Sequence, residues 1–215
     1  TKTAELVKLS ENSFRDVNIA FANELSMICD KAGLDVWELI DLANLHPRVN
    51  ILQPGPGVGG HCIAVDPWFI VSKDRENSKL IKTSRIVNDS KPLWVINKVK
   101  QEVQDLLEQN LEEKIKVSCL GLSFKPDIDD LRQSPALEIS KIPSKEPEIE
   151  LYVVEPNINN IPKSLDKSAS LITLEEAFIK SDIILILVDH QEFIEEIHNF
   201  PLNVRIIDTK GLLSR

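Results

Sequence analysis

The chain has 215 residues, enough for one or two domains with a buried core, and a formal net charge of −9. An acidic chain is a poor match for a phosphate backbone, so we expect no nucleic-acid partner. The longest apolar run, residues 183–188, is far shorter than the ~20 residues of a membrane-spanning helix, so we expect no membrane partner. Three widely separated cysteines argue against a disulfide framework and favour the reducing cytoplasm.

Helical periodicity dominates the start of the chain. Residues 3–32 predict one long helix, with Gly33 as its stop, because apolar residues recur at close to helical spacing. These residues are Ala4, Leu6, Val7, Phe14, Val17, Phe21, Leu25 and Ile28. Asp35 and Glu38 have the spacing of a capping box for a second helix, which Pro47 closes.

Two further helices are expected before the character of the chain changes. Asp66 and Pro67 are typical of an N-cap followed by proline at the first helical position. Another helical region runs from about 78 to 112, with an interruption or restart near Pro92. The sequence therefore predicts an all-helical region over residues 1–110.

The remainder, residues 114–215, alternates strands with helices. Four short apolar runs predict strands, at 114–124, 149–156, 182–189 and 203–211, and helical segments begin at 134 and 174. This alternation is typical of a parallel, doubly wound, Rossmann-like sheet. The predicted fold class is therefore α/β, a helical region followed by an α/β domain.

The stretch QPGPGVGGHCIAVDPW, residues 53–68, holds four of the seven glycines of the chain and one cysteine, Cys62. A thiol just ahead of a helix N-terminus can be exposed and have a lowered pKa, which suits a nucleophile. The alternative is a buried structural cysteine beside a turn. Cys29 and Cys119 lie in apolar periodic segments and are predicted core residues.

His61 adjoins Cys62, but neighbouring side chains on extended backbone point to opposite sides, which argues against a Cys/His dyad. His61, Cys62 and Asp66 do not have the spacing of a zinc site, so we expect no metal. Lys8 and Asn12 are four residues apart and share one helix face. They could present a cation and an amide to a single oxygen, although an ordinary solvated helix surface is the alternative.

The stretch GLSFKPDIDDLRQS, residues 121–134, follows the first predicted strand. Ligands of open parallel sheets bind outside the carboxyl ends of the strands, which is where Lys125 and Arg132 would lie, ready for phosphate. The stretch is not the G-x-G-x-x-G fingerprint. His190 and Lys210 also follow strand ends, but loops in such places are usually polar.

Three stretches, AELVKLSENSFRDVNIAFANEL, PGPGVGGHCIAVDPW and GLSFKPDIDDLRQSPA, in this order and spacing resemble the UDP-glucose/GDP-mannose dehydrogenase family over essentially the whole chain. GGHCIAVDPWFIV is most similar to the branch that acts on UDP-N-acetylhexosamines. The resemblance implies UDP-N-acetyl-D-mannosamine as substrate. UDP-N-acetylglucosamine is one alternative, and a catalytically silent UDP-sugar-binding and dimerisation module is another.

Family members begin with an NAD-binding Rossmann domain, whose glycine-rich fingerprint this chain lacks. We therefore expect a fragment that comprises the central helical dimerisation region and the UDP-sugar-binding domain, with NAD as the cofactor of the whole enzyme. The resemblance implies oxidation of the sugar C6 alcohol to an acid in two hydride transfers. Cys62 would be the nucleophile, with Lys8 and Asn12 at the developing oxyanion and Asp66 assisting proton transfer through water.

The substrate-binding residues that the resemblance implies are Arg48, Gly57, Val58, Gly59, Gly60, His61, Phe124, Lys125 and Lys210. Arg48 resembles an arginine that reaches the substrate of the partner subunit, and the family implies a homodimer through the helical region. Lys210 stands where relatives often carry arginine. Arg132 resembles a residue that approaches the NAD phosphates.

Overall fold

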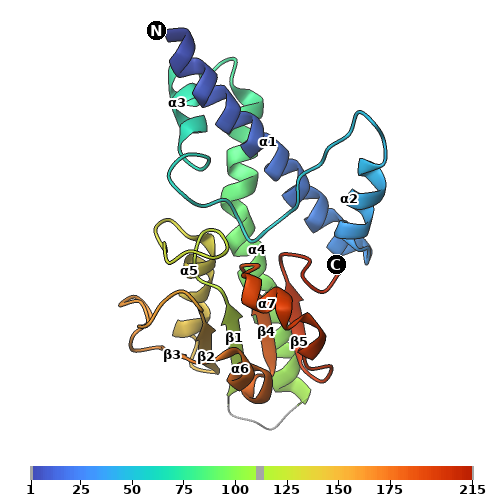
Figure 1. Ribbon diagram of the computed structural model, residues 1–215, viewed down its shortest axis with the longest axis vertical. Coiled ribbons are helices and arrows are strands. Elements are labelled where there is room, and N and C mark those ends of the chain that lie inside the picture. The colour runs from blue at the N-terminus through green and yellow to red at the C-terminus, as the bar shows by residue number, and fades with distance from the viewer. Residues whose placement is uncertain (1, 110–113, 215) are drawn as a thin grey trace. The chain divides into compact units, whose positions relative to one another are not determined.

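The computed structural model describes residues 2–109 and 114–214, and these form two compact units. The first runs to Lys91 and the second from Pro92 to Leu213, so the division falls inside one long helix, α4 (Lys79–Gln109) (Figure 1). Each unit has its own set of packed elements.

The first unit is helical, as predicted. It contains α1 (Lys2–Ala32), α2 (Val36–Asn44), α3 (Asp66–Lys73) and the first part of α4. The end of α1 falls directly before Gly33. The carboxylate of Asp35 caps α2, because its Oδ1 accepts hydrogen bonds from the amides of Trp37 at 2.8 Å and Glu38 at 3.2 Å.

Two details of the helix predictions are wrong. The N-cap of α3 is Val65, and Asp66 is already the first helical residue, with a side chain that makes no capping hydrogen bond. The carboxylate of Asp66 instead contacts another helix. The second error concerns Pro92, because α4 continues through it without interruption. Packed residues on both sides hold the helix together there, including buried Asn88 before the proline and Val95 after it. The predicted extension of this helix over 110–112 lies outside the described residues.

Polar side chains share the buried face of α1 with Ala20, Ala22 and Cys29, and one apolar stripe of the helix is exposed. Five polar side chains of α1 are almost fully buried, namely Asn12, Ser13, Asp16, Asn23 and Ser26. Val7, Phe14, Phe21 and Ile28 recur every seven residues and are 53%, 70%, 54% and 56% exposed. The periodicity correctly predicted a helix, but the interior of the unit packs against the opposite face.

A chain of buried hydrogen bonds connects α1, α4 and the glycine-rich loop. Arg85 Nη1 lies 2.6 Å and Asn88 Nδ2 2.8 Å from Asp16 Oδ1. Asn88 Oδ1 accepts from Asn23 Nδ2 at 2.9 Å, and Asn23 Oδ1 accepts from the amide of Gly55 at 2.9 Å. Burial raises the pKa of Asp16 despite the opposing influence of Arg85. The base of the glycine-rich loop is thereby fixed to the helix pair.

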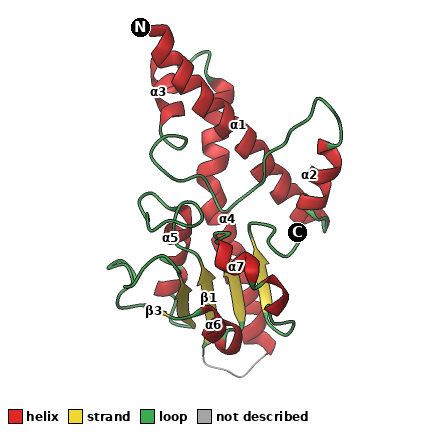
Figure 2. Cartoon of the chain, viewed as in Figure 1, coloured by secondary structure: helices red, strands yellow, loops and turns green. Residues whose placement is uncertain are grey.

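The second unit is a five-stranded parallel sheet with the order β3-β2-β1-β4-β5. Its strands are β1 (Ile115–Leu120), β2 (Ile149–Val154), β3 (Ala169–Leu171), β4 (Ile183–Ile186) and β5 (Arg205–Asp208). The helices are the second part of α4, α5 (Pro135–Ser140), α6 (Leu174–Lys180) and α7 (Gln191–Glu195), with 3-10 turns at Pro143–Lys145 and Ile197–Asn199. Helices and loops surround the strands (Figure 2).

Alternate residues of β4 divide between two hydrophobic cores. Ile183 and Leu185 join α4 and α5 in one core, whereas Ile184 and Ile186 join α6 and α7 in the other. Both faces of the sheet are therefore covered, which confirms the doubly wound architecture. The sequence missed β3 and α7, which are only three and five residues long.

Within residues 2–109 and 114–214, no helix combines the length and the apolar character that crossing a membrane requires.

We predict that Asp16→Ala lowers the free energy of unfolding by about 3–5 kcal/mol, because it leaves the buried guanidinium of Arg85 without its buried partner. Asp89→Ala is the matched control, since Asp89 pairs with the same arginine but has a side chain that is 51% exposed. Its loss should stay below about 1 kcal/mol. Urea unfolding of the variants measures both, and equal losses would contradict the assignment.

Candidate functional site

The loop between α2 and α3 presents Cys62 to solvent. The thiol is free and exposed, and the carbonyl of Cys62 accepts hydrogen bonds from the amides of Val65 at 3.1 Å and Asp66 at 2.8 Å. A tight turn therefore holds the cysteine at the start of α3. Cys29 and Cys119 are free but buried, as predicted, and burial raises the pKa of Cys119 to about 11. Cys62 is the thiol that has access to a ligand.

An amide–carboxylate pair lies one turn from this cysteine. Asn12 Nδ2 donates to Asp66 Oδ2 at 2.5 Å, which joins α1 to the first residue of α3. Asn12 is almost fully buried and Asp66 is half-buried. Lys8 does not share this contact in the structure: it is exposed, and its Nζ lies 3.7 Å from Glu11 Oε2. The structure thus brings together Asn12, Asp66 and the Cys62 turn, and places Lys8 at the surface of α1.

The glycine-rich loop has a backbone that requires glycine. Gly60, directly before His61 and Cys62, is buried and has a φ of +84°, in the left-handed region that other residues rarely adopt. Gly57, Val58 and Gly59 are half-buried, and His61 is exposed. The backbone of this segment therefore stays partly accessible while its conformation is constrained.

Arg48 lies earlier in the same loop and is exposed. Its backbone amide donates to Nδ1 of His46 at 3.2 Å, which shapes the turn after α2. Arg48 therefore lies at the surface of the loop.

In the second unit, a loop leaves the carboxyl end of β1 at Gly121. This residue has a φ of +90°, and a Cβ added to it would lie 2.4 Å from Cβ of Val188, so only glycine fits. The loop then displays half-buried Phe124 and exposed Lys125, and the amide of Phe124 donates to the carbonyl of Asp130 at 3.3 Å. Both predicted nucleotide-contacting residues are therefore on one constrained loop.

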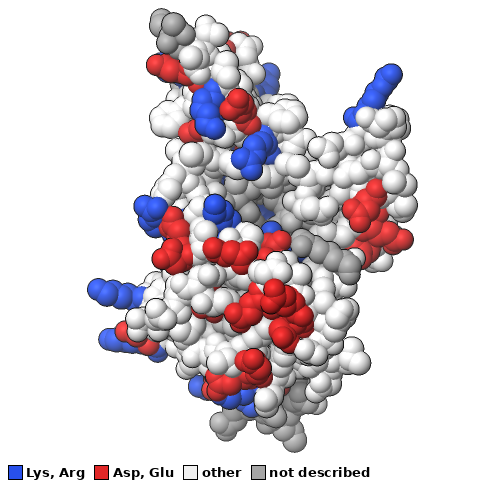
Figure 3. Space-filling view, in the orientation of Figure 1, with Lys and Arg blue, Asp and Glu red and all other residues white. Residues whose placement is uncertain are grey.

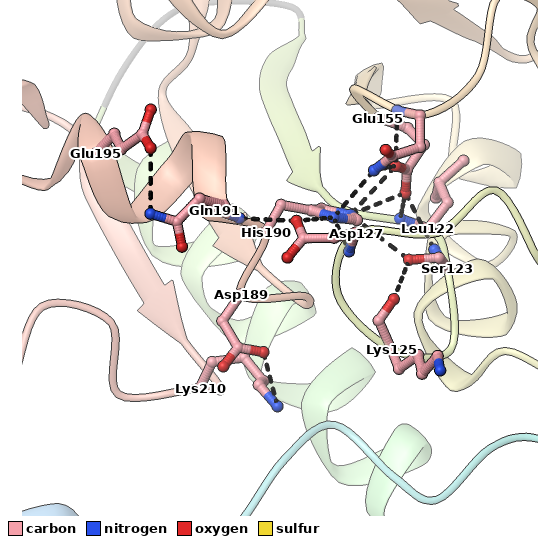
Figure 4. A network of polar contacts seen from close by, with 11 residues as sticks. Leu122, Ser123, Lys125, Asp127, Glu155, Asp189, His190, Gln191, Glu195 and Lys210 are labelled. Atoms are coloured by element: carbon pink, nitrogen blue, oxygen red, sulfur yellow. Dashed lines mark hydrogen bonds and ion pairs between the residues drawn. The ribbon is translucent and has the colours of Figure 1, made fainter.

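A buried carboxylate and histidine lie behind this loop (Figure 4). Oε2 of Glu155 accepts hydrogen bonds from the amides of Leu122 at 2.7 Å and Ser123 at 3.1 Å. Nε2 of His190 lies 3.1 Å from Oε1 and 3.2 Å from Oε2 of Glu155. Sequence reasoning gave His190 little weight and missed Glu155, although an acidic residue directly after the second strand is a recognisable feature of dinucleotide-binding sheets.

Hydrogen bonds set the charge of Glu155. Burial is the largest single influence and raises its pKa, but hydrogen bonds from His190 and from the amide of Leu122 outweigh it. The net pKa of Glu155 lies below its usual value, so the buried group is an anion at neutral pH.

Lys210 follows β5 and is held by two acidic residues. Its Nζ lies 3.1 Å from Oδ1 of Asp189 (Figure 4). Its backbone amide donates to Oδ1 of Asp208 at 2.8 Å. Burial raises the pKa of Asp208, despite hydrogen bonds from the amides of Lys210 and Leu213. Lys210 is therefore oriented at the carboxyl end of the sheet.

Arg132 is exposed and bound to its own loop. Its Nε and Nη2 donate to the two carboxylate oxygens of Asp130 at 2.9 Å and 2.7 Å. These hydrogen bonds raise the pKa of Arg132. A ligand phosphate at this arginine would have to compete with Asp130.

Acidic side chains gather over α6 and α7 on the face that Figure 3 shows, whereas Lys and Arg are scattered. Among the residues that the structure describes, no group of three or more His, Cys, Asp or Glu side chains could hold a metal ion. The chemically competent features are an exposed thiol beside an amide–carboxylate pair, and a constrained loop with an aromatic ring and a cation.

Comparisons with known proteins place both halves of the chain in one family. Residues 2–90 match the model of the UDP-glucose/GDP-mannose dehydrogenase family, central domain, and residues 118–215 match that of the UDP binding domain of the same family. The chain is 57% identical over 215 residues to UDP-N-acetyl-D-mannosamine dehydrogenase of Escherichia coli K12, covering 99% of this chain and 51% of that protein.

A second relative, NDP-N-acetyl-D-galactosaminuronic acid dehydrogenase of Ralstonia solanacearum, is 54% identical over 214 residues, covering 99% of this chain and 49% of the relative. The solved structure of UDP-N-acetyl-mannosamine dehydrogenase from S. aureus superposes with a TM-score of 0.81 at 41% identity, covering 100% of this chain and 49% of that one. The chain thus spans about half the length of the relatives it matches.

Proposed function

The chain belongs to the UDP-glucose/GDP-mannose dehydrogenase family, and from this premise we propose that it is the central and UDP-sugar-binding part of an NAD-dependent UDP-N-acetyl-D-mannosamine 6-dehydrogenase of the cytoplasm. The observation that carries the proposal is the exposed Cys62 beside the Asn12–Asp66 pair. A nucleophilic thiol at this place is what a two-step oxidation of an alcohol to an acid needs.

The N-acetylhexosamine class of substrate is supported by the names of the relatives. One is named for UDP-N-acetyl-D-mannosamine, and another of nearly equal identity is named for an N-acetyl-D-galactosaminuronic acid. UDP-N-acetylglucosamine is the alternative substrate, since N-acetylglucosamine and N-acetylmannosamine differ only in the configuration at C2. A catalytically silent UDP-sugar-binding module is the alternative of another class.

In the proposed reaction NAD, when bound, supplies the acceptor for a hydride from C6 in each of the two oxidations. The thiolate of Cys62 adds to the carbonyl carbon of the C6 aldehyde, and the carbonyl oxygen takes a proton from water to become the hydroxyl of a thiohemiacetal. In the second oxidation a hydride leaves C6 and the hydroxyl proton returns to water, so that the adduct becomes a thioester. Water then adds to the thioester carbonyl, the C–S bond breaks, and the sulfur leaves with a proton as the thiol of Cys62, which releases the acid.

Asp66 and Asn12 have complementary roles in this scheme. The carboxylate of Asp66 lies near the turn of Cys62 and can hold and pass a proton through water. Asn12 keeps that carboxylate oriented with one amide hydrogen, and its other hydrogen can donate to the oxyanion or to a water beside it. Lys8, which is exposed and four residues earlier on α1, is proposed to swing from Glu11 to the same oxyanion.

The loops are proposed to bind the nucleotide sugar by different parts. The backbone of Gly57, Val58, Gly59 and Gly60, with His61, would surround the sugar and the diphosphate, and Arg48 would reach the substrate of a partner subunit. Phe124, Lys125 and Lys210 would contact the UDP moiety. Their support is the constrained backbone of each loop and the cations at the carboxyl end of the sheet.

The described residues offer few groups that could bind NAD. The amides of Leu122 and Ser123 and the carboxylate of Glu155, which in a dinucleotide-binding sheet would serve the ligand, are bonded to each other. We therefore propose that this chain offers NAD only Arg132, and that the cofactor is held mainly by another domain of the enzyme.

The homodimer is supported by the exposed stripe on α1. Val7, Phe14, Phe21 and Ile28 form an apolar row over four heptads, and apolar rows at this period pack against another helix. A second copy of the chain is the proposed partner.

We predict that UDP-sugars raise the melting temperature of the isolated chain and that NAD does not. Ligand at about 100 times its Kd stabilises the folded state by roughly 2.7 kcal/mol, which for a chain of this size is on the order of 5–10 °C. Thermal scans with UDP-N-acetylmannosamine, UDP-N-acetylglucosamine and UDP-glucose should rank the sugars. The absence of any shift would count against the proposed function.

We predict that Cys62 alone among the three cysteines reacts quickly with iodoacetamide, and that a bound UDP-sugar slows this reaction. In a protein that joins this chain to an NAD-binding domain, Cys62→Ala should abolish formation of the acid, because no thiohemiacetal can form. Undiminished acid from this variant would refute the role of Cys62 as nucleophile, whereas a native fusion protein that forms no acid would favour the silent module.

We predict that the native chain is a dimer in static light scattering and that a Phe14→Glu, Phe21→Glu double variant is a monomer, because charges on the stripe cannot be buried. Ile179→Glu, at an exposed apolar position of the second unit, is the control and should remain dimeric. A native chain that is monomeric at all concentrations would contradict the interface.

A further inference from the structure

The loop after β1 has an internal anion at the place where comparable sheets bind an external one. In dinucleotide-binding parallel sheets, backbone amides after the first strand take the phosphate, and an acidic residue after the second strand takes the ribose. Here the sheet has the corresponding strand order, and Glu155 follows β2. Its carboxylate does not face a ligand, because it accepts the amides of Leu122 and Ser123 and is only 4% exposed.

His190 continues this arrangement to the other end of the loop. The amide of Asp127 donates to Nδ1 of His190 at 3.0 Å, so that nitrogen carries no proton and Nε2 is the donor to Glu155. The imidazole is 1% exposed and packs edge-on against Phe193, with ring centroids 5.2 Å apart. The orientation of the imidazole is therefore fixed. His190 connects the carboxylate of Glu155 to the backbone of Asp127, five residues after Leu122.

The held segment is under backbone strain that these contacts must overcome. Asp127 has a φ of +60°, which is unfavourable for a residue with a side chain. The carboxylate of Asp127 accepts a hydrogen bond from the amide of Gln191 at 2.9 Å. Gln191 directly follows His190, which accepts a hydrogen bond from the amide of Asp127. The hydroxyl of Ser123 donates to the carbonyl of Lys125 at 2.7 Å, which bridges the middle of the segment.

We propose that Glu155 and His190 are positioning residues for the nucleotide, and that Glu155 fills the phosphate position of the sheet with an internal carboxylate so that the loop displays Phe124 and Lys125 in a binding-ready conformation. The reason lies in the hydrogen bonds: Glu155 holds the start of the loop, and His190 holds its strained end (Figure 4). The amides that are bonded to Glu155 are not available to a diphosphate. Recognition then passes from the backbone to the side chains that the loop presents.

This inference rests on the proposed function in one respect, namely that UDP is the moiety bound by the loop. It adds that the same sheet selects against a dinucleotide, since both of the elements that would hold one are bonded to each other. The lowered pKa of Glu155 is consistent with a permanent anion at this position.

Calorimetric titration of UDP into the chain and its variants tests the proposal. Glu155→Ala leaves buried amides without an acceptor, and the Kd of UDP should rise about 10-fold. Formate, a small carboxylate that can enter the vacated position, should restore the Kd, whereas chloride at equal ionic strength should not. Glu150→Ala, at an exposed position of the same strand, is the matched control and should bind UDP like the native chain.

A second pair of variants serves if Glu155→Ala does not fold. His190→Asn keeps an acceptor for the amide of Asp127, and His190→Ala removes it, so the alanine variant should lose more affinity for UDP. Equal affinities of native and variant chains, or a loss in Glu155→Ala that formate leaves unchanged, would overturn the proposal.

Amide hydrogen exchange of residues 122–127 separates this inference from the proposed function. In the native chain the amides of Leu122, Ser123 and Asp127 should exchange slowly. In Glu155→Ala they should exchange faster, and added formate should make the exchange of that variant slow again. A native chain that does not bind UDP would refute the function, whereas exchange that is insensitive to Glu155→Ala would refute the positioning role.

Discussion

The functional loops of this chain depend on one constraint, that a buried or half-buried backbone amide needs an acceptor. The loops are irregular, so strands and helices cannot supply that acceptor. Buried or half-buried side chains supply it instead: Asn23 for the amide of Gly55, Asn44 for that of Ile51, and Glu155 for those of Leu122 and Ser123. Each loop is thereby a fixed part of its unit, although it makes few hydrogen bonds to its own backbone.

The same constraint explains why so much polar character is buried in the first unit. The interior between α1 and α4 contains Asp16, Arg85 and Asn88, whereas an apolar interface of similar shape would cost less desolvation. The polar chain extends to Asn23 and the glycine-rich loop, so its specific geometry reaches the loop that carries Cys62. The apolar side of α1 is left for another surface.

The two units hold their candidate ligand-binding groups by different means. In the first, a contact between helices removes Asp66 from its expected capping role and places it beside Asn12. In the second, the carboxylate of Glu155 occupies the amides after the first strand, where such a sheet would otherwise bind a phosphate, and His190 accepts the amide of Asp127. Both arrangements leave Cys62 and Lys125 exposed on a backbone whose conformation is constrained, and such pre-organisation favours binding and catalysis.

The sequence alone determined the class of each half, because helical spacing and strand–helix alternation are local patterns that packing amplifies. It also singled out Cys62 in a glycine-rich loop and Lys125 on the loop after the first strand, since glycine positions and strand ends are readable in one dimension, whereas Phe124 was singled out by the family resemblance. Only the tertiary structure decided which face of α1 is buried, that Pro92 lies inside a continuous helix, that Asp66 bonds to Asn12, and that Glu155 and His190 meet. Each of these depends on residues 35 to 54 positions apart or on packing from both sides, and no local propensity encodes which distant partner will satisfy a polar group.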